Sequence, residues 1–325
     1  MEQRTLGRSG LRVSRIGIGL AAVGRPAYIT VGRDADLGPE RGVDVLRQRA
    51  HELIDAAMSA GITYVDVARS YGLAESFVGT WLDGRPAGTP VPVIGSKWGY
   101  TYVGDWRMDA PVHEVKDHSL AAFRRQLAES RAILGDRLRL YQVHSATLES
   151  GILEDQAVLG ALADLGEAGT AVGLSVSGPR QADVIRRALD VRVDGRNPFS
   201  TVQATWNVLE QSAGAALEEA HEAGFGVLVK EVLANGRLVA ASDCPPTVAA
   251  IAARHVVGPD AVAIAAALAQ PWADVVLSGA VTVGQLDANL AGLGIRLLAE
   301  ELAELVSLAE SSAEYWEARG QLAWT

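Results

Sequence analysis

Four side chains that can exchange protons or carry charge lie at or just after short apolar runs in the first half of the chain. Asp66, Lys97 and His144 each end such a run, and Tyr71 follows five residues after Asp66. Lysine is scarce, because Lys97, Lys116 and Lys230 are the only three among 325 residues. If the runs are parallel strands, their carboxyl ends meet at one edge, so the four side chains would converge and could carry out acid–base chemistry.

Each of the four residues taken alone has a plainer interpretation. An Asp after a strand is often a capping or turn residue. A lone His at a strand end is usually a hydrogen-bonded core residue. The occurrence of four such side chains at neighbouring strand ends favours a site over these alternatives.

The elements that must position these residues alternate along the whole chain. Eight short, mostly continuous apolar runs predict strands buried on both faces, as in a parallel sheet covered by helices. Eight strand–helix units in this length predict a single (β/α)8 TIM barrel. The expected strands are Ser14–Gly19, Thr63–Val67, Val91–Lys97, Leu138–Val143, Ala171–Val176, Thr201–Ala204, Gly226–Val229 and Asp274–Leu277. The expected helices are Asp44–Ala60, Ala74–Leu82, His113–Leu134, Leu153–Leu165, Arg180–Leu189, Ala213–Ala223, Thr247–Arg254, Ala261–Gln270 and Val283–Ala291.

Both ends of the chain lie outside this count. Arg4–Leu6 and Leu11–Val13 flank the turn sequence Gly7-Arg-Ser-Gly10 and predict an N-terminal β-hairpin that plugs one end of the barrel. A helix over Leu297–Glu310 and a tail with two tryptophans predict a C-terminal extension. We found no internal repeat or low-complexity linker and therefore treat residues 1–325 as one domain.

Two connections are longer than a barrel needs, Ala21–Gly42 and Trp98–Val112, and both follow strands on the face where barrels place their chemistry. Trp98, Trp106 and Trp206 follow strand ends, so we expect them to line a substrate site. In the C-terminal tail, Trp316 and Trp324 are expected to close over that site. Solvent-facing loops with chance aromatics are the alternative.

Charge and composition exclude several classes of protein. The net charge of −10 and the sequence pI of about 5.1 argue against nucleic-acid binding, which needs a basic face. The single cysteine, Cys244, excludes an intramolecular disulfide framework and multi-cysteine zinc sites. The N-terminus has no apolar signal segment, and the longest apolar stretch is interrupted by polar residues, so we expect a cytoplasmic protein without a membrane partner. His113, Asp117 and His118 do not share one helix face, so no metal site is expected.

The sequence resembles the aldo-keto reductase superfamily along nearly its whole length. The resemblance is carried by Arg4-Thr-Leu-Gly-Arg-Ser-Gly-Leu-Arg-Val-Ser-Arg-Ile-Gly17, by Gly61-Ile-Thr-Tyr-Val-Asp66-Val-Ala-Arg-Ser-Tyr71-Gly72 and by Ser278-Gly-Ala-Val-Thr-Val-Gly-Gln285-Leu-Asp-Ala-Asn289. Through Gly173-Leu-Ser-Val-Ser-Gly-Pro179 it is most similar to the aldose- and sugar-dehydrogenase-like branch.

The resemblance implies that Asp66, Tyr71, Lys97 and His144 are catalytic in NAD(P)(H)-dependent interconversion of a carbonyl and an alcohol. Tyr71 would be the general acid and base. Because a phenol has a pKa of about 10, we expect the Lys97 ammonium to lower the pKa of Tyr71 by up to about three units. Asp66 would keep Lys97 charged, and His144 would orient the carbonyl oxygen.

The cofactor contacts are also implied by the resemblance. Ser175 and Gln203 would bind the carboxamide, and Gln285 and Asn289 the adenosine end. The remaining expected contacts are Gly19, Asp66, Lys230, Leu233 and Gly279. The amides that begin the helix after the last strand would bind a phosphate.

Some positions depart from the family pattern. The usual Ser-Asn pair is Ser175-Val176, the usual Glu before Asn289 is Ala288, and the tyrosine that commonly stacks on nicotinamide aligns with Lys230. NADP(H) is expected in preference to NAD(H), but no Lys or Arg lies between residues 279 and 290 to bind a 2′-phosphate, so NAD(H) stays open. The expected partner is a small carbonyl or sugar molecule, and a homo-oligomer is compatible with the sequence.

Two other functions remain open from the sequence. One is a cofactor-binding, redox-sensing subunit with little turnover. The other is a metal-dependent barrel hydrolase or isomerase, which would need several histidines and carboxylates at strand ends, whereas only one histidine lies there.

Overall fold

The computed structural model describes residues 1–239 and 244–325, and its centre is a closed barrel of eight parallel strands. Neighbouring strands follow one another in chain order around the barrel, and β12 pairs back with β3. The predicted (β/α)8 barrel is therefore confirmed. Its strands are β3 (Ile16–Gly19), β4 (Tyr64–Asp66), β5 (Val93–Trp98), β8 (Leu138–Ala146), β9 (Ala171–Val176), β10 (Thr201–Thr205), β11 (Gly226–Lys230) and β12 (Val275–Ser278).

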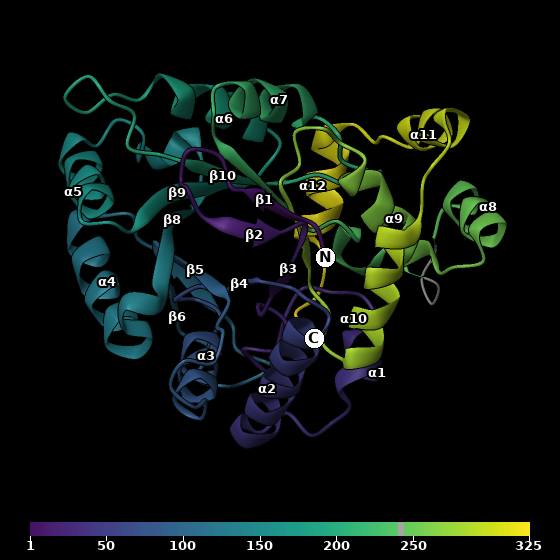
Figure 1. Ribbon diagram of the computed structural model, residues 1–325, viewed down its shortest axis with the longest axis horizontal. Helices are drawn as coiled ribbons and strands as arrows, with labels where there is room; N and C mark the ends of the chain where they lie inside the picture. Colours follow the sequence, from purple (N-terminus) through teal and green to yellow (C-terminus); the bar gives the residue numbers. More distant parts are fainter. Residues whose placement is uncertain (240–243) are drawn as a thin grey trace.

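Helices surround the strands, and most of them present an apolar stripe to the barrel (Figure 1). The longest, α2 (Val43–Ser59), buries residues at positions 46, 50, 53, 54 and 57, the spacing of one helix face. The other helices that follow barrel strands are α3 (Ala74–Asp83), α4 (Leu120–Leu134), α5 (Gln156–Glu167), α6 (Gln181–Asp190), α7 (Gly214–Glu222), α8 (Pro246–His255), α9 (Pro259–Leu268) and α10 (Val283–Leu290).

The N-terminal hairpin pairs β1 (Gln3–Thr5) with β2 (Arg12–Ser14) and covers one end of the barrel. Its Leu6, Leu11 and Val13 are buried in one cluster with Tyr64 and Leu140 of the barrel strands. The C-terminal extension consists of α11 (Ala299–Val306) and α12 (Ser312–Gly320). In Figure 1, α11 lies beside α8 at the right edge, whereas α12 lies close to the barrel.

The expectation of a helix beginning at His113 is wrong. Residues Glu114–Lys116 form strand β7, which pairs antiparallel with β6 (Tyr100–Tyr102), and α4 begins only at Leu120. The hydroxyl of Ser119 accepts a hydrogen bond from the backbone N–H of Ala122 and so caps this helix. The pairing of β7 with β6 therefore outweighs the helical pattern expected for residues 113–119.

Two expected loops contain more structure than their sequences indicate. The connection after β3 includes the short helix α1 (Arg33–Leu37) and is ordered by Arg33, which is buried and donates hydrogen bonds to several backbone carbonyls, including Pro26 at 2.8 Å. The connection after β5 contains the β6–β7 hairpin. Both connections leave the carboxyl ends of strands and therefore border the expected site.

Candidate active site

Lys97 is the centre of a buried group of polar side chains at the ends of β4 and β5. Its Nζ donates hydrogen bonds to Asp66 Oδ2, to the Val67 carbonyl at 3.1 Å and to the Tyr71 hydroxyl at 3.2 Å. Lys97 is fully buried and Asp66 is 2% exposed, so the pair is shielded from solvent. The sequence expectation that Asp66, Tyr71 and Lys97 converge agrees with this geometry.

Tyr71 is positioned by a tight approach of two backbone segments. Gly72, directly after it, has φ +58°, and a Cβ there would lie 2.4 Å from the Gly24 carbonyl oxygen. A Cβ on Gly24 would in turn lie 2.5 Å from the Tyr71 carbonyl oxygen. Both positions require glycine, since a side chain would force the connection after β3 away from Tyr71.

His144 lies at an irregularity in strand β8. The register with β9 shifts between Val143 and Ala146, and Ser145 has φ +49°. Such a bulge redirects a side chain at the end of a strand. The hydroxyl of Ser175 accepts a hydrogen bond from the Ser145 N–H at 2.8 Å and so fixes the bulge. The His144 ring then meets Tyr71 edge to face, with ring centroids 5.5 Å apart.

Burial and nearby cations determine the charge of His144. Burial, together with Lys97 and Lys230, lowers the pKa of His144 well below its usual 6.5. The imidazole is therefore neutral at neutral pH. Its Nδ1 lies 3.3 Å from Ser70 Oγ, and when that hydroxyl donates, the imidazole proton is on Nε2.

The expected lowering of the Tyr71 pKa is wrong for this structure. Burial and the Asp66 carboxylate raise the pKa of Tyr71 well above 10, and the nearby Arg25 only partly opposes them. Lys97 is neutralised by Asp66, so it stabilises the phenolate less than an isolated ammonium would. Tyr71 is therefore a protonated phenol at neutral pH.

Arg25 is a residue of this site that the sequence analysis missed. It is 2% exposed, and its guanidinium lies 5.3 Å from the Tyr71 ring centroid, 4.8 Å from that of Tyr28 and 4.9 Å from that of Trp324. It also forms an ion pair with Glu114 at 2.6 Å. Arg25 thus joins the connection after β3, the β6–β7 hairpin and the C-terminal tail beside Tyr71. An Arg in a long, Gly- and Pro-rich loop is the only sign of this role in the sequence.

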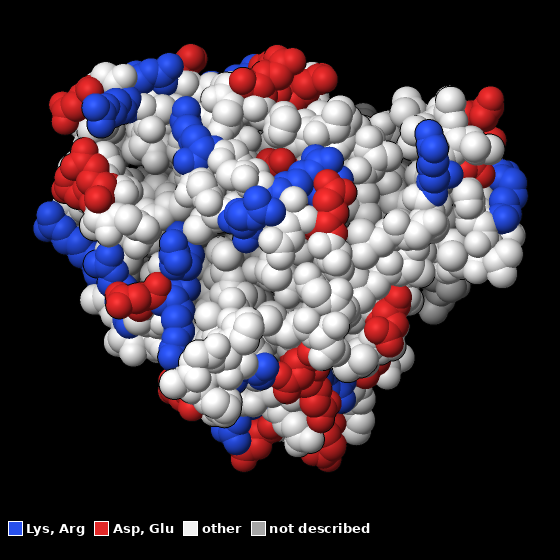
Figure 2. All heavy atoms as spheres, in the orientation of Figure 1, with Lys and Arg blue, Asp and Glu red and all other residues white. Residues whose placement is uncertain are grey.

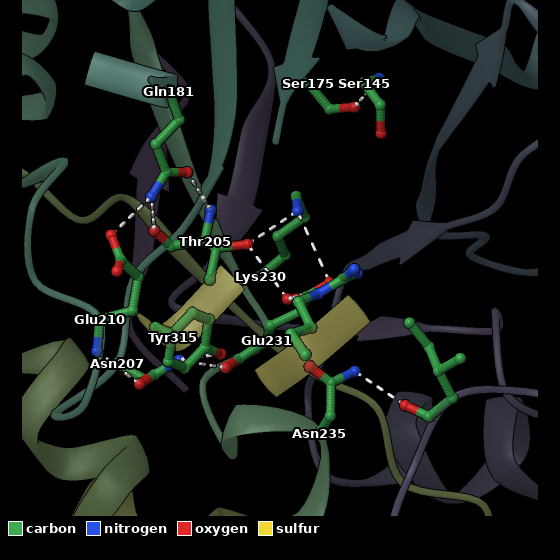
Figure 3. Close-up of polar contacts among 12 residues, drawn as sticks. Ser145, Ser175, Gln181, Thr205, Asn207, Glu210, Lys230, Glu231, Asn235 and Tyr315 are labelled. Carbon is green, nitrogen blue, oxygen red and sulfur yellow. Dashed lines mark hydrogen bonds and ion pairs between the residues drawn. The ribbon is translucent and has the colours of Figure 1, made fainter. Parts of the chain in front are cut away.

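A second charged group lies at the end of β11 (Figure 3). Lys230 is its only member that was expected from the sequence. Lys230 donates a hydrogen bond to Thr205 Oγ1 at 2.8 Å and lies 3.7 Å from Glu231 Oε1. Glu231 is bound through both of its oxygens by Arg319 of α12. Burial opposes ionisation of Glu231, but Arg319 and Lys230 lower its pKa to about 2. Burial lowers the pKa of Lys230 to about 8, against the influence of Glu231.

The residues expected at the carboxamide of a nicotinamide have free hydrogen-bonding capacity. Ser175 Oγ accepts from Ser145 and keeps its own proton to donate. Gln203 donates through Nε2 to Asp66 Oδ1 at 3.0 Å and keeps its carbonyl oxygen to accept. A carboxamide needs one donor and one acceptor of this kind, so the two side chains fit it.

The residues expected at the other end of the cofactor form hydrogen bonds within the protein. Asn289 is 1% exposed, and its amide donates to Ser278 Oγ at 2.8 Å, so it joins α10 to β12. Gln285 Oε1 accepts from the Val281 N–H at 2.9 Å. Gly279 has open space around its Cα, which leaves room for close approach of a ligand. The remaining two expected contacts, Gly19 and Leu233, lie at the end of β3 and after β11.

Of the three tryptophans expected at the substrate, Trp98 faces away from the barrel interior. Trp98 is fully buried, with its ring 5.0 Å from that of Phe123 in α4. Successive residues of a strand point to opposite faces of the sheet. Since Lys97 points into the barrel, Trp98 points outward to the helices. Trp206 is 6% exposed and packs edge to face against Trp272. Trp106 is half-buried and donates through Nε1 to the Arg41 carbonyl at 2.8 Å, so it joins the two long connections.

A cavity of about 490 Å³ lies between the β6–β7 hairpin and the C-terminal tail. Its lining includes Tyr100, His113, Glu114 and Trp324. The rings of His113 and Trp324 are stacked, 4.3 Å apart and 10° from parallel. The Tyr100 ring lies 5.0 Å from that of His144, so the cavity borders the candidate catalytic group.

Other kinds of site find little support in the described parts of the chain. No group of three or more His, Cys, Asp or Glu side chains within residues 1–239 and 244–325 could hold a metal ion. Basic and acidic side chains are interspersed on the face in Figure 2 and form no continuous basic surface there. No single helix of the described residues is long and apolar enough to cross a membrane; α8 and α9 reach that length only together and are bent by 90° between them.

Comparisons of the sequence and of the structure with known proteins point to the same family. The sequence profile of the aldo/keto reductase family matches residues 39–310. The chain is 26% identical to "Aldo-keto reductase str7" of Strobilurus tenacellus, with 95% of this chain and 92% of that protein covered. It is also 26% identical to "Protein tas" of Escherichia coli K12, with 94% and 96% covered. The holo form of aldo-keto reductase AKR11C1 from Bacillus halodurans shares the fold, with a TM-score of 0.71, 23% identity and coverage of 96% and 97%.

Proposed function

The chain belongs to the aldo/keto reductase family, and we propose that it interconverts a carbonyl compound and its alcohol with Tyr71 as proton donor and acceptor. Members of this family reduce small carbonyl compounds with NAD(P)H, which supplies the hydride when bound. The observation that carries the proposal is the 3.2 Å contact between Lys97 Nζ and the Tyr71 hydroxyl, in a buried group closed by Asp66.

In the direction of reduction, the proton moves from the Tyr71 hydroxyl to the carbonyl oxygen. The raised pKa of Tyr71 keeps the phenol protonated at neutral pH, which is the form that reduction requires. The phenolate left behind is stabilised by the adjacent Lys97 ammonium. Asp66 fixes that ammonium in place, and in alcohol oxidation the same groups work in reverse.

His144 orients the carbonyl in this proposal. A neutral imidazole with its proton on Nε2 can donate a hydrogen bond to the carbonyl oxygen without competing as an acid. The edge-to-face contact between the two rings supports the proposal that both act on the same carbonyl oxygen. The substrate class we propose is an aldehyde, a ketone or a sugar lactol or lactone.

For the cofactor we propose NADP(H) in preference to NAD(H), as the resemblance implies. The absence of Lys and Arg between residues 279 and 290 makes NAD(H) the alternative to test in parallel. The alternative of a redox-sensing subunit receives no support from the relatives described above.

The test is the Tyr71→Phe variant with a panel of aldehydes, ketones and aldoses. We expect turnover to fall by about 10²- to 10⁴-fold, with the affinity for the reduced cofactor unchanged within about twofold. Tyr141→Phe is the matched control, because Tyr141 is fully buried and its hydroxyl lies 3.4 Å from that of Ser130 in α4, away from Lys97. Equal loss of turnover and cofactor affinity in Tyr71→Phe would instead mean that Tyr71 is structural.

A further inference from the structure

The charged side chains beside Tyr71 form neutral pairs. Lys97 is paired with Asp66, and Arg25 with Glu114. Because burial and cations hold the pKa of His144 low, this histidine adds no charge at neutral pH. These five residues together are therefore neutral.

The group at the end of β11 is not neutral. Glu231 is shared between two cations, Arg319 and Lys230 (Figure 3). Arg319 binds both carboxylate oxygens, whereas Lys230 lies 3.7 Å away and directs a hydrogen bond to the uncharged Thr205 hydroxyl instead. One positive charge, centred on Lys230, is therefore in excess among these described residues.

Lys230 lies across the mouth from the candidate catalytic group. In the cyclic order of strands, β11 is four steps from β5 in either direction, so the end residue Lys230 is opposite Lys97. Lys230 is the last residue of β11, and its hydrogen bond to Thr205, the last residue of β10, keeps its ammonium at this rim of the barrel. The amide side chain of Gln203 and the hydroxyl of Ser175 belong to β10 and β9, the strands next along the rim from β11. A nicotinamide bound by them would therefore be held beside the strand that ends in Lys230.

We propose that Lys230 makes this mouth bind the reduced nicotinamide in preference to the oxidised one. The inference rests on the proposed function. The oxidised ring carries a positive charge that the reduced ring lacks, so a fixed cation nearby weakens binding of the oxidised form only. An aromatic side chain would act in the opposite sense, because its face attracts a cation. One unit charge in a partly buried site changes the ratio of the two dissociation constants on the order of tenfold.

The preference depends on pH through the charge of Lys230. Since the pKa of Lys230 is about 8, the ammonium is mostly charged at pH 7 and mostly neutral at pH 9.5. The charged groups that face it are Glu231 and Arg319 and, across the mouth, Lys97. Glu231 and Arg319 keep their charges in this range, because the pKa of Glu231 is about 2 and that of Arg319 is raised by Glu231.

The experiment is a titration of the intrinsic tryptophan fluorescence of the purified protein with NADPH and with NADP+, and in parallel with NADH and NAD+. The measured quantity is the ratio of the oxidised to the reduced dissociation constant, for the wild type, Lys230→Met, Lys230→Arg and Lys230→Tyr. We expect the ratio at pH 7 to fall on the order of tenfold in Lys230→Met and further in Lys230→Tyr, and to stay high in Lys230→Arg. In the wild type it should fall between pH 7 and pH 9.5, and in Lys230→Met it should not.

The outcomes separate this inference from the proposed function. If the wild type binds a reduced cofactor but the ratio is the same in Lys230→Met, the inference is wrong and the proposed function stands. If the wild type binds neither form of either cofactor, the proposed function is wrong and the inference with it. Thermal unfolding of Lys230→Met and Lys230→Arg shows whether a changed ratio reflects charge or loss of structure.

Discussion

The ion pair between Arg319 and Glu231 connects the C-terminal helix α12 to the barrel mouth, and its removal gives a quantitative prediction. An ordinary glutamate has a pKa near 4.5, whereas that of Glu231 is about 2. This difference corresponds to about 3 kcal/mol of unfolding free energy at neutral pH. We therefore expect Arg319→Met to lose up to about 3 kcal/mol, with Lys230 at 3.7 Å limiting the loss.

The sign of the pH dependence follows from the lowered pKa. Because the folded-state pKa of Glu231 lies below the unfolded value, the stabilisation is fully present above pH 4.5 and is lost as the pH falls towards 2. The difference between wild type and Arg319→Met should therefore be largest at pH 6 to 8 and should shrink at pH 3. Urea unfolding followed by tryptophan fluorescence at each pH measures it.

The matched control is Arg186→Met. Arg186 binds both oxygens of Glu219 at 2.8 Å, as Arg319 binds Glu231, but both partners are almost half exposed. A solvated pair of this kind contributes little, so we expect no measurable change. An equal loss in the two variants, or a loss in Arg319→Met that is the same at pH 3 and pH 7, would refute the electrostatic reasoning.

Two further predictions concern the candidate catalytic group. Because the pKa of His144 is well below 6.5, kcat/KM for reduction should not change between pH 6 and 8. His144→Gln should lower kcat/KM by about 10²-fold and leave its pH profile flat. An inflection of the wild-type profile near pH 6.5 would contradict the neutral state of His144. Gly72→Ala should lower the free energy of unfolding by about 2 kcal/mol or more, because φ is +58° and the new Cβ would lie 2.4 Å from the Gly24 oxygen. Gly151→Ala, with φ +63° and open space, measures the backbone contribution alone, and equal losses would show that the contact with Gly24 costs nothing.

The barrel could be predicted from the sequence because its signals are local. Most barrel strands are short runs buried on both faces, such as Ala171–Val176, so they can be recognised without knowing which strand pairs with them. Strand β7 could not be predicted in this way, because it forms by pairing with β6, more than ten positions earlier. Its residues show no periodic apolar pattern that would indicate this pairing.

The candidate site was predictable where it depends on strand ends. Asp66, Lys97 and His144 follow apolar runs, and parallel strands bring such residues together. Arg25 and Glu114, or Glu231 and Arg319, are ion pairs between residues about 90 positions apart, which spacing cannot reveal. The error at Trp98 was avoidable, because alternation along β5 places it on the opposite face from Lys97.

The measurement that tests the role of Tyr71 most directly is hydride transfer in a single turnover. Excess protein is mixed with reduced cofactor carrying deuterium at the transferable position and with an aldehyde such as 4-nitrobenzaldehyde, and the alcohol is analysed by mass spectrometry. We expect one deuterium on the carbinol carbon with the wild type, and transfer slower by at least about 10²-fold with Tyr71→Phe, which still binds the cofactor. Deuterium transfer by Tyr71→Phe at the wild-type rate would contradict the assignment of Tyr71 as the proton donor.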